Sequence, residues 1–393
     1  MRNTLSGLRY LKYPVAACLL ALLAACSSLP EPQYPPAPLP AHSGEDRLTS
    51  VWRDHSGYGE RWRGYQLLPA LRGNLLVTAD AQGLLQAFDL SRTGFLQSDL
   101  LWMKDLEVGV SAGLALHDNH LYVATQNGEL LSLDISNGNE LWRVRLSSEA
   151  LSPPQADGNL LVVHTADGKL AGFDRSNGRQ LWLHDSLIPL LTLRGTAAPT
   201  VTSLQTFAGF ANGKLVAVDN RTGQARWEAR VAQPRGRTDI ERLVDINGQA
   251  RLAQGMLIVN SFQGQTQALD PFSGRARWSR DLSSYHAAAI HDGKVFVVDE
   301  ASRIHALDLL SGSSLWQQDK LYGRSLTEPV ILSGRLVVAD YQGYLHLLDP
   351  DSGKLTGRRS FDLDGIRATP VIDDNRLLVH SIRGRLGLFT LKN

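Results

Sequence analysis

Cysteine is nearly absent from this sequence of 393 residues, which contains only two. Cys18 lies inside an apolar N-terminal run, and Cys26 ends that run. If the run is cleaved off, no pair of thiols remains for a disulfide, a cysteine metal site or an adjacent Cys-Cys pair. The stability of the folded part must therefore come from a large hydrophobic core.

The net charge is also small, and common catalytic and nucleotide-binding motifs are missing. The net charge is +1, and it becomes −2 when the first 25 residues, which carry three cations and no acid, are removed. This balance excludes the basic footprint that nucleic-acid binding requires. The motifs H-E-x-x-H, G-x-S-x-G and G-x-x-x-x-G-K-[ST] do not occur, and the eleven histidines do not cluster at metal spacing. The sequence thus predicts no catalytic residue, no metal and no cofactor.

The N-terminus has the pattern of a secretory signal peptide. Arg2, Arg9 and Lys12 precede an apolar run over 15–25 that is too short to span a bilayer. The run ends in "LAAC", which resembles the lipobox of bacterial lipoproteins, so we expect a signal peptide over 1–25 and lipidation of Cys26. A plain signal peptide, with Cys26 incidental, is the alternative. Ser27 after the cysteine favours the outer membrane in that family.

Six prolines between Pro30 and Pro40 follow the cysteine. Proline disrupts helices and sheets and favours an extended polyproline conformation. The sequence therefore predicts a tether over 26–47, with a proline-recognition ligand as the alternative, and one folded domain over 48–393.

The domain consists of a repeated phrase, G-x-L-x-x-x-D-x-x-[ST/N]-G-x-x-x-W. Its aspartates recur every 38 to 51 residues, the period of a four-stranded propeller blade. They are Asp89, Asp134, Asp174, Asp219, Asp270, Asp308 and Asp349, and an eighth copy places Thr390 at this position. Alternating apolar runs before and within each copy predict antiparallel hairpins. The sequence predicts an all-β fold, an eight-bladed β-propeller of four-stranded antiparallel blades.

Each position that recurs in the phrase has a structural interpretation. The aspartate side chain can accept backbone N–H groups in its turn, and the glycine four residues later supplies a positive φ. The tryptophan, eight residues after the aspartate in five copies, is expected to bury against the next blade. In the first copy Trp102 lies thirteen residues after Asp89, which requires an insertion, and in the seventh Gly357 replaces the tryptophan.

The eighth copy ends before a fourth strand can form, which would leave an unpaired edge. The segment "LTSVWRD" near the N-terminus contains Trp52 in a context like the other tryptophans. We therefore expect residues 48–53 to supply the outer strand of the last blade and to close the ring.

The repeats resemble the quinoprotein-type eight-bladed propellers. Together with the lipobox and the proline-rich segment, they resemble the BamB-type lipoproteins of the outer-membrane β-barrel assembly machinery over essentially the whole chain. The segment "IPLLTLRGTAAPT" contains L-x-L-R-G, which matches the family's contact with the periplasmic domains of the barrel-forming subunit. "DIERLVDINGQ" resembles the family's R-L-x-D-x-D loop, although it has asparagine at the second acidic position.

The resemblance implies a partner-binding site on five residues: Leu191, Leu193, Arg194, Asp245 and Asn247. From the residues alone, the two leucines could equally face a core, and the aspartate could be an ordinary loop acid. The long polar insertion over 231–250 favours a functional loop, because long loops on rigid scaffolds often carry function.

The family resemblance implies a non-enzymatic scaffold, lipid-anchored at the periplasmic face of the cell outer membrane. Its expected partners are the barrel-forming subunit and nascent outer-membrane proteins, which exposed blade edges could hold by β-augmentation. One alternative is a quinone-dependent periplasmic dehydrogenase, against which the lack of an adjacent Cys-Cys pair argues. Another is a propeller that binds peptidoglycan or sugar, which the residues leave open.

Overall fold

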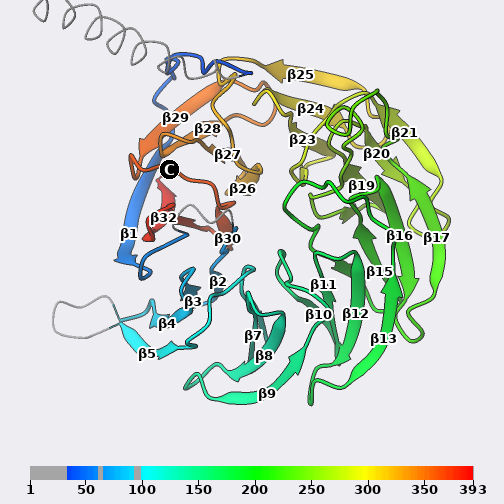
Figure 1. Ribbon diagram of the computed structural model, residues 1–393. Coiled ribbons are helices and arrows are strands. Elements are labelled where there is room, and N and C mark those ends of the chain that lie inside the picture. The colour runs from blue at the N-terminus through cyan, green and yellow to red at the C-terminus, as the bar shows by residue number, and fades with distance from the viewer. Residues whose placement is uncertain (1–32, 61–64, 93–98, 393) are drawn as a thin grey trace, which may run out of the picture. The chain divides into compact units, whose positions relative to one another are not determined.

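The structure, a computed structural model, describes residues 33–60, 65–92 and 99–392. Residues 37–393 form one compact unit. Its described part contains thirty-two strands in eight four-stranded antiparallel sheets, arranged as blades around a central axis (Figure 1). The predicted eight-bladed propeller is confirmed.

The blades are numbered here in chain order. Blade 1 is β2(Ala70–Arg72), β3(Leu75–Ala79), β4(Leu84–Asp89) and β5(Leu100–Asp105); blade 2 is β6(Ala115–His117), β7(His120–Ala124), β8(Glu129–Asp134) and β9(Glu140–Arg145); blade 3 is β10(Gln155–Asp157), β11(Leu160–His164), β12(Lys169–Asp174) and β13(Gln180–Asp185); blade 4 is β14(Thr200–Val201), β15(Gln205–Gly209), β16(Lys214–Asp219) and β17(Ala225–Arg230). Blade 5 is β18(Arg251–Ala253), β19(Met256–Asn260), β20(Thr266–Leu269) and β21(Ala276–Arg280); blade 6 is β22(Ala289–His291), β23(Lys294–Val298), β24(Ile304–Asp308) and β25(Ser314–Gln318); blade 7 is β26(Val330–Leu332), β27(Arg335–Ala339), β28(Tyr344–Leu348) and β29(Leu355–Ser360); blade 8 is β30(Val371–Asp373), β31(Arg376–His380), β32(Arg385–Lys392) and β1(Arg47–His55).

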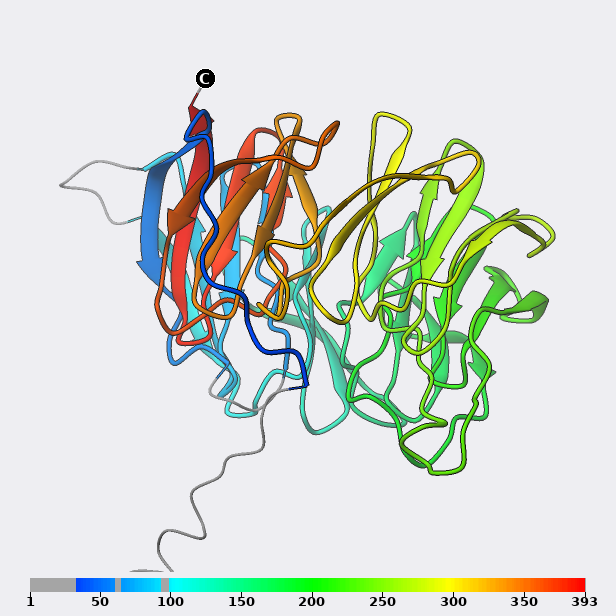
Figure 2. The same cartoon turned by 90° about the horizontal axis from the view of Figure 1, so that it is seen from above.

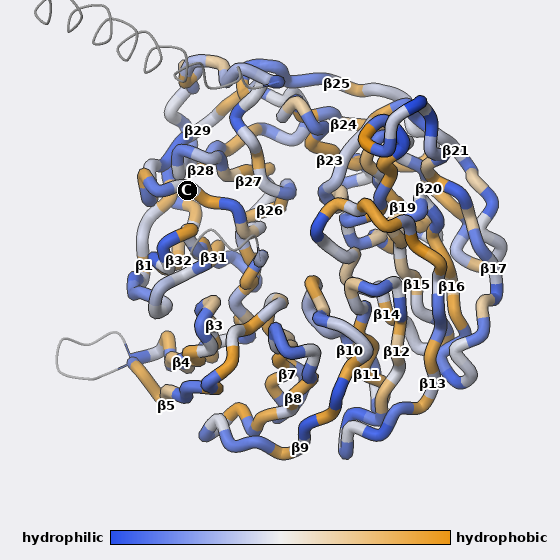
Figure 3. Tube along the Cα trace, viewed as in Figure 1, coloured by the Kyte–Doolittle hydropathy of each residue, from blue (hydrophilic) through white to orange (hydrophobic). Residues whose placement is uncertain are grey.

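The core lies between blades, where the apolar faces of neighbouring sheets meet. One cluster joins Val162 and Leu170 of blade 3 with Phe210 and Val216 of blade 4. The two middle strands of each blade are almost wholly buried, because they have sheet neighbours on both sides and blades on both faces. In Figure 3 the hydrophobic colour accordingly lies within the blades, and hydrophilic stretches lie at turns and outer edges.

In blades 2 to 7 the repeated aspartate and glycine form the turn before the outer strand, as predicted. In blade 4, Oδ1 of Asp219 accepts the backbone N–H of Arg221 at 2.9 Å and of Thr222 at 3.2 Å. Gly223 has φ +71°, a conformation that a side chain disfavours. The aspartate side chain therefore supplies an acceptor for backbone N–H groups that have no backbone partner in the turn.

In blades 1 to 6 a tryptophan of the outer strand packs against the next blade, which confirms the predicted role. Nε1 of Trp182 donates to the Asn220 carbonyl in the turn of blade 4, at 2.7 Å. Its ring covers Gly223, where an added Cβ would lie 2.8 Å from the tryptophan Cβ. Equivalent pairs recur in the described residues: Trp102–Gly138, Trp142–Gly178, Trp227–Gly274, Trp278–Gly312 and Trp316–Gly353. The insertion expected before Trp102 lies partly outside the described residues.

The ring is closed by β1 and β32, as predicted. The two strands pair along their length, so the N-terminal strand completes the blade that the C-terminal strands begin. Trp52 pairs with Leu388 beside a register shift, the position that Trp227 holds opposite Ala217 in blade 4. Its indole N–H donates to the Asp99 carboxylate in blade 1.

Blade 7 has no tryptophan because its neighbour has no turn to receive one. In blade 8 the outer strand comes from the N-terminus, and the chain leading into it, residues 37–46, runs along β29. A Cβ on Gly357 would overlap the carbonyl oxygen of Asp46. The glycine thus makes room for this incoming segment.

Candidate functional site

Two segments interrupt the regular repeat on one side of the propeller. Residues 186–199 connect blade 3 to blade 4, and residues 231–250 connect blade 4 to blade 5. Figure 2 shows these green and yellow-green loops projecting beyond the strands at the lower right. The five residues of the predicted partner site lie on these two loops.

Asp245 joins the two loops. The backbone N–H groups of Ile246 and of Leu193, which belongs to the other loop, lie close to its carboxyl group and lower its pKa against the effect of burial. One oxygen of this group, Oδ2, has no hydrogen-bond partner among the described residues. The Asp245 carbonyl accepts the N–H of Phe262 in blade 5 at 2.8 Å. Only 1% of Asp245 is exposed, and burial raises the pKa of its carboxyl group to about 7. The side chain therefore acts as an internal link between loops.

This position differs from the expectation that Asp245 contacts a partner directly. A carboxyl group buried by both loops and by blade 5 is out of a partner's reach in this structure. Asn247, two residues later, is partly buried and packs against Gly195, where an added Cβ would lie 3.4 Å from the asparagine Cγ. The buried Oδ1 of Asn247 has no hydrogen-bond partner among the described residues. At these two positions the second loop therefore faces inward.

The first loop carries the accessible part of the predicted site. Leu191 is 45% exposed, whereas Leu193 is partly buried. The Arg194 guanidinium lies over the Tyr65 ring, 4.7 Å from its centroid, and 3.4 Å from a Glu149 carboxylate oxygen. The Tyr65 hydroxyl donates to the other Glu149 oxygen at 2.9 Å. Tyr65 and Glu149 therefore hold Arg194 in place, and neither residue belongs to the segments singled out from the sequence.

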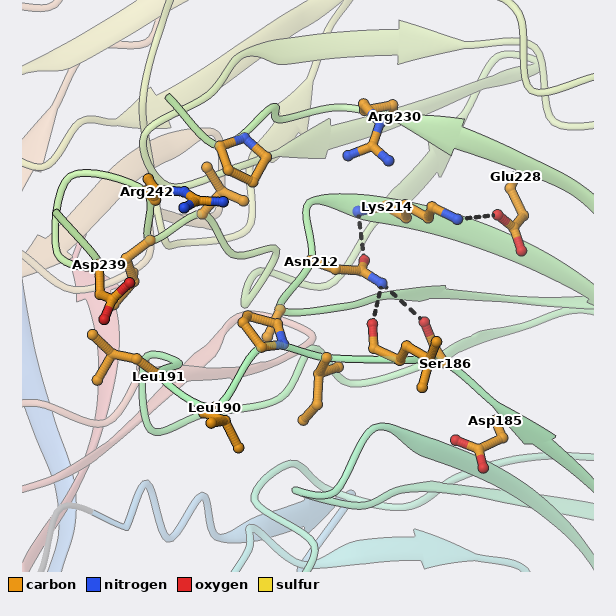
Figure 4. A pocket seen from close by; sticks show the side chains of 17 residues that line it. Asp185, Ser186, Leu190, Leu191, Asn212, Lys214, Glu228, Arg230, Asp239 and Arg242 are labelled. Atoms are coloured by element: carbon orange, nitrogen blue, oxygen red, sulfur yellow. Dashed lines mark hydrogen bonds and ion pairs between the residues drawn. The ribbon is translucent and has the colours of Figure 1, made fainter. Parts of the chain in front are cut away.

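A groove of about 810 Å³ separates the two loops, and the sequence did not indicate it (Figure 4). Leu190 and Leu191 lie on one side of it, and Arg230 and Arg242 lie on the other. Leu187 and Leu190 are almost fully exposed, at 92% and 108%. The run of apolar letters "LIPLL" is a sequence signal for this wall, but sequence alone does not distinguish an exposed run from a buried one.

The loop wall is fixed to blade 4 by one amide. Nδ2 of Asn212 donates to the Leu187 carbonyl at 2.7 Å and to the Ser186 hydroxyl at 3.1 Å. On the blade, Lys214 pairs with Glu228 at 2.7 Å. The exposed leucines are thus presented on a backbone that polar contacts hold.

Three further points concern the lipid, metal ions and the membrane. Cys26, the predicted lipidation site, lies outside the described residues. No group of three or more histidine, cysteine or acidic side chains is placed to hold a metal ion in the part of the chain that the structure describes. Within the same residues, no helix is long and apolar enough to cross a bilayer.

Comparison with known proteins shows the family to which the chain belongs. A family model described as "Outer membrane protein assembly factor BamB" matches residues 81–318 and 303–392. A protein of that name from Pseudomonas aeruginosa is 39% identical over 379 residues, which cover 96% of this chain and 98% of that protein. Its namesake from Escherichia coli is 34% identical over 372 residues, with coverages of 93% and 95%.

Solved structures show the same fold. The crystal structure of BamB from Moraxella catarrhalis matches with a TM-score of 0.79 at 25% identity, over 88% of this chain and all of that one. A quinohemoprotein alcohol dehydrogenase from Comamonas testosteroni matches with a TM-score of 0.71 at 12% identity, over 87% and 76% of the two chains, and shares the fold alone. From the family model and the relatives, this chain belongs to the family of the outer membrane protein assembly factor BamB.

Proposed function

We propose that this chain is a non-enzymatic scaffold in outer-membrane protein assembly, and that it docks onto the periplasmic domains of the barrel-forming subunit. One observation carries the proposal. The two loops that depart from the repeat meet at the buried Asp245, and together they present exposed leucines and an arginine on a rigid propeller. The names of the relatives support the assembly role.

Leu191 and Arg194 are the contact residues that the geometry favours. An exposed leucine loses apolar surface to water on binding, and arginine is among the residues enriched at binding hot spots. Stacking on Tyr65 holds the guanidinium before binding, which reduces the entropy lost when the partner arrives. Leu193 and Asn247 lie deeper, where the two loops pack together. The Asp245 carboxyl group lies beside the backbone of the first loop at Leu193.

In this proposal the protein is lipid-anchored through Cys26 at the periplasmic face of the outer membrane. The docked propeller then stands beside the barrel-forming subunit and assists the folding and insertion of nascent outer-membrane proteins. The binding of those clients to the exposed outer strands by β-augmentation is a further part of the proposal.

The proposal is tested by recovering the partner from membranes. Leu191→Ala combined with Arg194→Ala should reduce co-purification of the barrel-forming subunit, because loss of a hot-spot residue costs about 2 kcal/mol or more in binding, roughly thirtyfold in Kd. Leu310→Ala with Arg145→Ala is the matched control, since both residues are exposed and lie in other blades.

Thermal unfolding of both double variants should match the parent chain, which would show that the propeller is intact. Equal recovery of the barrel-forming subunit with the loop variant and with the control would refute the docking site. Recovery of no such subunit with the parent chain would refute the assembly role itself.

A further inference from the structure

A cleft between blades 7 and 8 gathers positive charge far along the ring from the two loops. It has a volume of about 670 Å³ and lies where β1, β29 and β32 meet the segment 37–46. Four cations line it: Arg47, Arg358, Arg359 and Lys392. Figure 1 shows the three strands side by side near the C-terminus.

The two arginines of β29 are held in place by the protein itself. Arg358 donates to the Pro40 carbonyl at 2.8 Å, and its guanidinium lies 5.5 Å from the centroid of the Tyr344 ring. Arg359 donates to the Leu48 carbonyl at 2.8 Å and lies 5.5 Å from the centroid of the Phe389 ring. A guanidinium has five N–H donors, so each arginine keeps donors for a ligand while its side chain is already ordered.

The other two cations face each other. Arg47 and Lys392 are directly opposite on the paired strands β1 and β32, and both are exposed. Like charges at opposed positions of an antiparallel pair are destabilising. An anion between them would convert this repulsion into attraction.

Carboxylates of the described residues do not neutralise this cleft. None of the four cations pairs with a carboxylate among the residues that the structure describes, although twenty-three such pairs occur there. The one acidic residue that lines the cleft, Asp46, is engaged by Arg335 at 2.8 Å. The cleft is therefore ordered and positively charged, and no carboxylate of the described residues balances its charge.

We propose that this cleft binds a phosphate group carried on a larger polar molecule. Phosphate offers several acceptor oxygens around one centre, so it can engage guanidinium groups and an ammonium group from different strands, and arginine forks match its geometry. The volume exceeds that of one phosphate ion and accommodates an attached glycerol or sugar. This site lies apart from the two loops of the proposed docking function, so the phosphate proposal does not depend on that function.

The test uses the full chain in neutral detergent and thermal unfolding at constant ionic strength. The probes are inorganic phosphate, glycerol 3-phosphate and phosphatidylglycerol doped into the micelles, with sodium chloride and phosphatidylcholine as the references. A ligand that binds the folded state raises the unfolding temperature. Arg47→Gln with Lys392→Gln should weaken phosphate binding by about tenfold for each cation removed. Arg145→Gln, an exposed arginine at the end of β9, is the control.

Arg47→Glu gives a sharper readout, because it turns the repulsive cross-strand pair into an attractive one. It should raise the unfolding temperature without phosphate and abolish the response to phosphate. A response to glycerol 3-phosphate supports a soluble phosphate ester as ligand, and a response to phosphatidylglycerol alone supports a lipid headgroup. The proposal is overturned if no probe stabilises the parent chain, or if the Arg47/Lys392 variant and the Arg145 control respond like the parent.

Discussion

In the described residues, six of the repeated tryptophans pack on a glycine of the following blade, and this contact explains why both residues recur. The glycine has to meet two demands, since its φ is positive and its Cα lies against an indole ring. A side chain at that position would be strained by its backbone and would also push the tryptophan away. The two effects can be separated by experiment, because other glycines in the ring have a positive φ but no indole ring beside them.

Gly223→Ala should destabilise the fold more than Gly255→Ala. The two glycines have almost the same φ, +71° and +72°, but an alanine Cβ at 223 would lie 2.8 Å from Trp182, whereas nothing lies within 4 Å at 255. We expect a loss of about 1 kcal/mol in the free energy of unfolding at 255 and about 3 kcal/mol at 223. Urea unfolding measures both, and equal losses would contradict the docking interpretation.

Asp245 should make stability depend on pH. Its pKa is raised from 3.8 to about 7, mainly by burial. Below 3.8 both the folded and the unfolded chain keep the proton. Between the two values only the unfolded chain releases it, so the free energy of unfolding falls as the pH rises, and above about 7 the loss is complete. Asp245→Asn cannot ionise and should lack this slope in denaturant unfolding across the same window.

Parallel pH profiles for Asp245→Asn and the parent chain would contradict this assignment. The substitution keeps the size and shape of the side chain beside the Leu193 N–H, so it should preserve the junction of the two loops. Recovery of the partner by Asp245→Asn would show that the junction of the loops is sufficient for binding. Loss of the partner would show that the ionisable group is required.

At the scale of elements, the N-terminal segment is the feature that departs most from the repeat. Residues 37–46 bond to blade 7 through backbone groups: Ser43 N–H to Leu355 O at 3.1 Å and Asp46 N–H to Thr356 O at 3.2 Å. The sequence predicts a tether over 26–47, and part of that range lies on the propeller. At least residues 37–46 of the predicted tether are therefore held by the propeller.

A buried arginine anchors the start of this segment. Arg324 is 2% exposed, donates to the Asp340 carboxylate at 2.8 Å, and also donates to the Ala37 carbonyl at 2.9 Å. Arg324→Met should cost about 3–5 kcal/mol, because it leaves Asp340 buried without its cation. It should also speed hydrogen exchange at the Ala37 amide, which bonds to the Tyr322 carbonyl.

The matched control is Arg303→Met. Arg303 lies near Asp299 of blade 6, but its side chain is 41% exposed and the closest approach is 3.6 Å, so the loss should be small. If exchange at Ala37 is unchanged in Arg324→Met, the arginine does not anchor the segment.

At the scale of the whole molecule, one strand from the N-terminus decides whether the ring is closed. Trp52 packs edge-on against Phe88 and donates to Asp99, so it joins the last blade to the first. Trp52→Ala should cost about 3–5 kcal/mol in the free energy of unfolding, the usual cost of emptying a large buried aromatic site. Exchange at the β1 amides should rise before that of the other blades, since the closure opens locally.

Val51→Ala is the control for this closure. Val51 lies at the register shift beside Trp52 and is 44% exposed, so it should change stability by less than about 0.5 kcal/mol. A cost for Trp52→Ala no greater than that for Val51→Ala would contradict the view that this tryptophan closes the ring.

The sequence by itself determined the repeating part of the protein. Hairpin periodicity, the Asp-to-Gly turn and the tryptophan spacing are local signals, and each acts within one blade or between adjacent blades, so the number of blades and the closing strand could be predicted. The tertiary structure alone decided the rest. The burial of Asp245, the setting of Arg194 on Tyr65 and Glu149, the docked N-terminal segment and the basic cleft all depend on residues far apart in the chain, which only the closed ring brings together.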